Sequence, residues 1–151
     1  MKTLITVIGM AIVIAFSANM AMAGSSQNSA ALKTANTLKS QMLRIKQIAW
    51  DAPGKPSKDY GRALEMLNDL SPEIDAYGDH LLSLTAKKKA ADLSANEQRL
   101  QGAAKKLKKQ SSDFTTAFGR LAVLLPPRIE RAVQENVLGA LSTVQKLLPR
   151  L

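Results

Sequence analysis

The sequence predicts an all-α protein: an antiparallel four-helix bundle whose long helices form coiled-coil-like hairpins. Its composition favours helices, because Ala, Leu, Lys and Gln are abundant and aromatic residues make up only 4% of the chain. Apolar residues recur at alternating intervals of three and four, which is typical of helices that pack along a common seam. Breakers divide this pattern into four stretches with short connections, so helices adjacent in sequence are expected to pack side by side.

The first 23 residues have the three-part layout of a secretory signal peptide. Lys2 supplies a positive charge, residues 4–16 form an uncharged apolar run, and Ala21-Met22-Ala23 ends the segment. We expect a signal-peptide helix, cleaved after Ala23, and a periplasmic or secreted mature protein. An uncleaved membrane anchor is the alternative, because about 20 residues of this kind can span a bilayer.

Residues 24–151 are expected to form a single helical-bundle domain. The chain has no cysteine, which excludes disulfides, thiol catalysis and cysteine-based metal sites. Residues 24–50 carry four bases and no acid, residues 51–79 seven acids and three bases, and residues 80–151 thirteen bases and five acids. The positive excess favours anionic partners.

The first two helices are separated by residues 51–56, where two prolines and a glycine prevent a helix from continuing. The second contains Ser71-Pro72, but its apolar spacing continues past this point. We therefore expect a kink or a capped restart with Ser71 as the N-cap. The predicted core positions are Ala31, Ala35, Leu38, Met42, Ile45 and Ala49, then Tyr60, Ala63, Leu67, Leu70, Ile74, Tyr77, Leu81 and Leu84.

The third helix is expected to begin after Ser94, because Ser94 and Glu97 have the spacing of a capping box. It ends at Pro126-Pro127, and the fourth helix closes at Pro149. The predicted core positions are Leu100, Ala104, Leu107, Ser111, Phe114, Phe118, Leu121 and Leu125, then Val133, Val137, Ala140, Val144 and Leu147.

Glycines inside the predicted helices require an explanation, because each costs about 1 kcal/mol relative to alanine. Gly61 and Gly78 are 17 residues apart, as are Gly102 and Gly119. We expect a neighbouring helix to approach closely at these positions. A groove in which a ligand lies against the backbone is the alternative.

No catalytic site, metal site or cofactor is expected. The single histidine, His80, has no carboxylate one turn away on its own helix. Asp75 and Asp79 share a helical face, but a solvated acidic stripe explains them better than an acid–base pair. The remaining alternative is a haem pocket that pairs His80 with Met42 or Met66.

The candidate binding residues are basic and lie in three clusters. Such clusters attract anionic lipid headgroups, lipopolysaccharide or polyanionic glycan. Nucleic acid is not expected, because no aromatic residues interleave with the lysines to stack bases. The clusters are Lys87, Lys88 and Lys89; Lys105, Lys106, Lys108 and Lys109; and Arg128 with Arg131, which lie with Lys146 and Arg150 around the last helix. That helix is expected to be the fourth helix of the core, and the alternatives are a basic amphipathic helix on a membrane surface or in a partner's groove.

The second cluster has a purely structural alternative. If the chain reverses near residue 90, Lys105 lies level with Asp75 and Lys109 with Ser71, so the acidic helix neutralises the basic one. The expected function is that of an exported, non-enzymatic binding, adaptor or chaperone-like module of the cell envelope. Its partner would be another envelope protein or a second copy. The alternative is a basic amphipathic binder of anionic lipid or an envelope polyanion.

Overall fold

The computed structural model describes residues 24–50, 52, 55–119 and 126–151, and every element in them is helical. This confirms the prediction of an all-α bundle. The expected signal segment and its cleavage site at Ala23 lie outside the described residues. The elements are α1 (Gly24–Ala49), α2 (Tyr60–Ser83), the 3₁₀ turn η1 (Ala90–Asp92), α3 (Ala95–Gly119), α4 (Pro126–Arg131), the π-helical η2 (Ala132–Leu138), α5 (Gly139–Leu147) and the 3₁₀ turn η3 (Leu148–Arg150).

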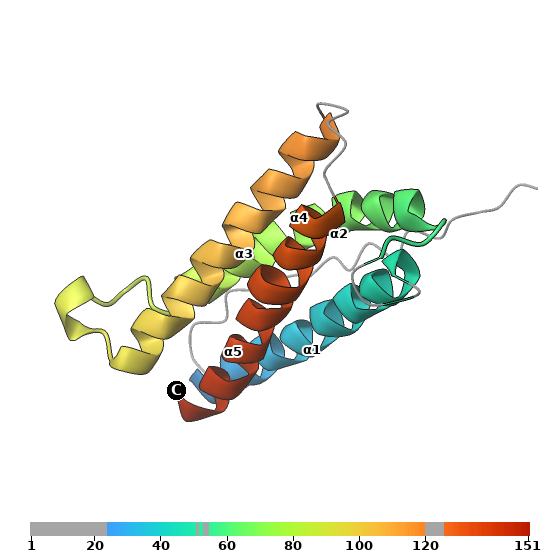
Figure 1. Cartoon of the computed structure of the whole chain (residues 1–151). Coiled ribbons are helices and arrows are strands. Elements are labelled where there is room, and N and C mark those ends of the chain that lie inside the picture. Colours follow the sequence, from blue (N-terminus) through green and yellow to red (C-terminus); the bar gives the residue numbers. More distant parts are fainter. Residues whose placement is uncertain (1–23, 51, 53–54, 120–125) are drawn as a thin grey trace, which may run out of the picture.

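Contacts join the four long helical segments into a closed ring, and Figure 1 shows these segments from the side. The segment made of α4, η2 and α5 is continuous and counts as the fourth helix. α1 packs against α2 and α5, and α3 packs against the same two helices from the other side. Helices adjacent in the chain are therefore neighbours in space. None of the described helices combines the length and the hydropathy needed to cross a bilayer.

Side-chain contacts show that neighbouring helices are antiparallel. The Tyr77 hydroxyl, late in α2, donates to the Ala31 carbonyl early in α1 at 2.8 Å. Figure 1 shows that α1 and the segment from α4 to α5 also run in opposite directions, and Lys39 of α1 contacts Gln145 of α5. Because Tyr77 is buried, the pKa of its phenol is raised above the ordinary value.

The predicted seams form the core. All predicted positions of the first and fourth helices are buried. Tyr60 of α2 and Leu84, the residue after α2, are half-buried against the core. The side chains of Phe118, Leu121 and Leu125 lie outside the described residues. The remaining predicted positions are also buried, including the polar Ser111.

The π-helical turn in the fourth helix was not predicted. Four buried residues of the fourth helix follow one another at intervals of four. In an α-helix, each such step rotates the side chain by about 40° around the helix axis, away from the core. The wider π turn, closed by the bond from the Gly139 N–H to the Gln134 carbonyl, compensates for that rotation. The four residues are Ile129, Val133, Val137 and Leu141.

α2 continues through Pro72 as one helix, so the predicted restart with Ser71 as N-cap is wrong. The Ser71 hydroxyl contacts α3 instead of the α2 backbone. Pro72 is exposed, and an exposed position reduces the cost of its missing N–H because water reaches the nearby backbone. The tertiary contact of Ser71 therefore replaces the local one.

The capping box before α3 is confirmed. The Ser94 N–H donates to Glu97 Oε2 at 2.8 Å, and the Glu97 N–H donates to Ser94 Oγ at 3.2 Å. The Lys88 ammonium contacts the other Glu97 oxygen at 2.6 Å. This hydrogen bond from Lys88, followed by that from the Ser94 backbone, lowers the pKa of Glu97. The turn between α2 and α3 is therefore fixed by one carboxylate.

Candidate anion-binding surfaces

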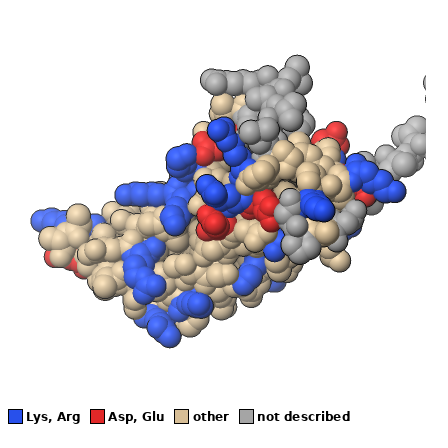
Figure 2. All heavy atoms as spheres, viewed as in Figure 1, with Lys and Arg blue, Asp and Glu red and all other residues tan. Residues whose placement is uncertain are grey.

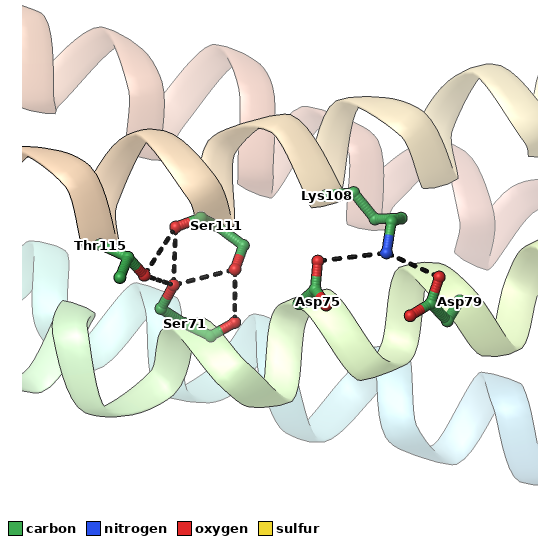
Figure 3. Close-up of polar contacts among 6 residues, drawn as sticks. All are labelled: Ser71, Asp75, Asp79, Lys108, Ser111 and Thr115. Carbon is green, nitrogen blue, oxygen red and sulfur yellow. Dashed lines mark hydrogen bonds and ion pairs between the residues drawn. The ribbon is translucent and has the colours of Figure 1, made fainter.

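The α2–α3 hairpin neutralises one member of the second basic cluster. The Lys108 ammonium lies 2.6 Å from Asp79 Oδ1 and 3.2 Å from Asp75 Oδ1 (Figure 3). The pKa of Lys108 is raised, chiefly by the hydrogen bond to Asp79. The expected neutralisation between the two helices exists, but Lys108 makes it where Lys105 was predicted. The pairing is therefore shifted along α3 by three residues, or about one helical turn, from the predicted position.

A buried cluster of hydroxyl groups fixes the register of this hairpin. Ser71 Oγ lies 2.7 Å from the Ser111 carbonyl and 2.9 Å from both Ser111 Oγ and Thr115 Oγ1 (Figure 3). Ser111 Oγ donates in turn to the Ser71 carbonyl at 2.7 Å. Ser71 and Ser111 are 1% and 4% exposed, so a shift of the hairpin would leave these groups without partners in the core.

The close-approach explanation holds for one glycine. A Cβ on Gly78 would lie 2.5 Å from Lys108 Cγ and 3.1 Å from the Ala104 carbonyl oxygen. Nothing lies within 4 Å of the corresponding positions at Gly61 and Gly102, so close approach is the wrong explanation for those two. Gly78 is therefore a point at which the backbones of α2 and α3 approach each other closely.

Three further predicted binding residues also contact carboxylates. Lys88 contacts Glu97, Lys109 contacts Asp113 at 2.6 Å, and Arg131 lies 3.9 Å from Glu135. The remaining predicted residues, Lys87, Lys89, Lys105, Lys106 and Arg128, are exposed. Within the described part of the chain, Lys89, Lys105, Lys106 and Arg128 have no carboxylate within 4.0 Å.

The charge balance differs sharply between elements. Residues 60–119 carry nine bases and eight acids, and residues 126–135 carry two of each. Residues 24–50 and 136–151 together carry six bases and no aspartate or glutamate. The positive excess of the described chain is therefore concentrated on α1 and α5, which pack against each other.

Contacts between α1 and α5 define a basic surface there. Lys39 Nζ donates to Gln145 Oε1 at 2.9 Å, and Gln145 Nε2 donates to Asn36 Oδ1 at 2.5 Å. Lys46 follows Lys39 by one heptad and so lies on the same side of α1. We use the term α1–α5 face for the surface that carries Lys33, Lys39, Lys46, Lys146 and Arg150.

This face contains no acidic partner for its cations. In the described residues, no carboxylate lies within 4.0 Å of any of its five basic side chains. Figure 2 shows Lys and Arg without an acidic side chain in the region around the C-terminal end of α5, whereas acidic side chains appear among the cations nearer α4. The side-chain charges of the α1–α5 face are therefore all positive.

The clustered lysines did not predict this surface. Its cations are scattered singly along residues 24–50 and 136–151, and only helix packing brings the two segments together. The signal that could have found it is the absence of acidic residues at both ends of the bundle sequence. A cluster of basic residues shows where positive charges are dense in the sequence. The net electrostatic potential of a surface depends equally on where carboxylates are absent.

His80 offers no support for a metal or haem site. It is half-buried, and burial lowers its pKa. Met66 lies on the same helix about 21 Å away, and Met42 is fully buried in α1. In the part of the chain that the structure describes, no group of three or more His, Cys, Asp or Glu side chains is arranged to hold a metal ion.

Comparison with protein-family models, curated proteins and solved structures finds no match to this chain. The surface and the core of the chain itself are therefore the guides to its function. The α1–α5 face is the feature of that surface with the clearest chemical preference, since it offers cations without carboxylates.

Proposed function

We propose that this chain is an exported, non-enzymatic binding protein of the cell envelope that acts as an adaptor or chaperone-like module. Residues 1–23 support export, because a charge, an apolar run and Ala21-Met22-Ala23 follow one another in the order of a secretory signal. The core supports a binding role, since the apolar seams face inward and leave charged and polar side chains outside. The partner is an acidic envelope protein or an acidic surface of a second copy.

One observation carries this proposal: residues 24–50 and 136–151, which contain α1 and α5, hold six bases and no aspartate or glutamate, while the rest of the described bundle is nearly balanced. A surface of one sign attracts partners of the opposite sign, speeds their association and rejects cationic competitors. The same observation supports a second candidate, a binder of anionic lipid or an envelope polyanion.

Export is tested by sequencing the N-terminus of the protein isolated from its native source after cell fractionation. We expect Gly24 as the first residue and recovery outside the cytoplasm. Recovery in the cytoplasm with residues 1–23 attached contradicts export.

Binding is tested by immobilising the exported form and exposing it to an extracytoplasmic extract at about 0.1 M and about 1 M salt. The Debye length falls from about 10 to about 3 Å between these conditions, so an electrostatically held partner is released. Size-exclusion chromatography with light scattering measures self-association in parallel. A strict monomer that captures nothing contradicts the adaptor role.

A further inference from the structure

We propose that the α1–α5 face docks on the headgroup surface of an anionic phospholipid bilayer. This inference rests on the second candidate of the proposed function, because it names the anionic surface that a basic face of this kind would hold. It places α1 and α5 against the lipid and the α2–α3 hairpin away from it.

The cations of the α1–α5 face form an extended array. α1 has 26 residues and is therefore about 39 Å long, and the five cations are spread along it and its antiparallel neighbour. A compact anion would contact only one or two of them. An extended, negatively charged plane can contact cations of both helices together, and each base near such a surface strengthens binding about fivefold.

Exposed apolar side chains accompany these cations. The two most exposed large hydrophobic residues of the described chain are Leu43, 46% exposed, and Leu151, 43% exposed. Leu43 follows Asn36 by one heptad, and Asn36 contacts Gln145, so Leu43 lies on the side of α1 that faces α5. Leu151 follows η3, which packs against α1. Leucines that lie among cations favour a bilayer interface, because they can insert between lipid headgroups there. A soluble polyanion has no apolar region in which a leucine could be buried.

The acidic residues of the α2–α3 hairpin determine the orientation on the bilayer. Docking through the hairpin would bring Asp75, Asp79 and Asp113 towards the anionic surface, and like charges repel. The α1–α5 face brings no such group. It lies on the opposite edge of the helix ring from the α2–α3 edge, about two helix diameters or 20 Å away, which exceeds the Debye length of about 10 Å at 0.1 M salt.

The test is flotation of the exported protein with vesicles of phosphatidylcholine alone, or of equal parts phosphatidylcholine and phosphatidylglycerol. A face variant combines Lys33→Gln, Lys46→Gln and Lys146→Gln. A matched control combines Lys89→Gln, Lys105→Gln and Lys106→Gln. Each removes three charges, and none of the six lysines has an ion pair in the described structure. Circular dichroism confirms that both variants keep their helices.

We expect the wild-type protein to bind only the anionic vesicles at about 0.1 M salt and to be released at about 1 M. The face variant should bind about 100-fold more weakly, while the control should change by less than about fivefold. A control that binds as weakly as the face variant, or more weakly, overturns the proposed face. Equal binding to both kinds of vesicle overturns the electrostatic basis.

Retention on immobilised heparin, a soluble polyanion, separates this inference from the proposed function. Retention on heparin without vesicle binding overturns the bilayer as the partner and leaves anion binding intact. If the protein binds neither heparin nor vesicles, both the bilayer partner and anion binding are overturned. A Leu43→Ser variant gives an independent readout, with vesicle binding expected to fall about tenfold and heparin retention to stay unchanged. Unchanged vesicle binding by this variant contradicts insertion of Leu43.

Discussion

Gly78 of α2 lies so close to Lys108 of α3 that a Cβ at position 78 would come within 2.5 Å of Lys108 Cγ. The same lysine reaches past the glycine to Asp75 and Asp79. The missing side chain therefore creates the space through which the lysine stem passes. Close backbone approach and charge pairing in this hairpin depend on each other.

Gly78→Ala should destabilise the protein, because the added methyl group meets both the Lys108 stem and the Ala104 carbonyl. Overpacking of this kind costs about 1–3 kcal/mol, more than the gain of about 1 kcal/mol from better helix propensity. Urea unfolding measures the difference. Adding Lys108→Ala to this variant should recover part of the loss.

Gly102→Ala is the matched control, since nothing lies within 4 Å of a Cβ there. It should stabilise the protein by up to about 1 kcal/mol. If the two alanine variants are equally stabilising, the close approach at Gly78 is contradicted.

The buried hydroxyl cluster predicts strong coupling between Ser71 and Ser111. Either serine-to-alanine change leaves a buried hydroxyl or carbonyl short of a partner and should cost about 1–3 kcal/mol. Because the two share hydrogen bonds, the double variant should lose less than the sum by about 0.5 kcal/mol or more. Denaturant unfolding of all four proteins gives this coupling energy. Ser112→Ala, at an exposed position, should be nearly neutral; strict additivity of the serine pair would contradict the cluster.

Both tyrosines should resist ionisation. Burial raises the pKa of Tyr60 to about 12, and raises that of Tyr77 further. Because the folded-state pKa lies above the unfolded value of 10.0, the buried neutral phenols contribute to the free energy of unfolding. This contribution is fully present below pH 10 and is lost as pH rises beyond it. Phenolate absorbance should therefore appear together with loss of the helical circular dichroism signal. Complete ionisation near pH 10 with the helices intact would contradict the burial of these rings.

The helices and their buried faces could be predicted from sequence because each depends on a local repeat. The first seam, from Ala31 to Ala49, and the capping box at Ser94 are examples, and both are confirmed. Ser71 was misassigned because its hydroxyl can bond either to the backbone of α2, as an N-cap, or to α3. Only the packed hairpin shows that it bonds to α3. The α1–α5 face escaped prediction for a similar reason, since it joins segments that are distant in sequence.

The hydrogen bonds of Glu97 predict a pH dependence of stability. Because Lys88 and the Ser94 backbone lower its pKa from an ordinary value of 4.5, its contribution is fully present above that pH. It is lost as pH falls through the lower folded-state pKa. Glu97→Gln keeps an oxygen that can accept the Ser94 N–H but removes the charge that faces Lys88. The variant should be less stable than the wild type at neutral pH, and the difference should shrink at about pH 3.

Urea unfolding at both pH values measures this difference, and Glu73→Gln is the control. Glu73 is exposed on α2 and makes no hydrogen bond or ion pair within the described structure, so its substitution should have little effect at either pH. A Glu97→Gln difference that is the same at both pH values would show that the carboxylate charge does not stabilise the turn. The capping geometry alone would then hold α3 in place, and Lys88 would be available to an external anion.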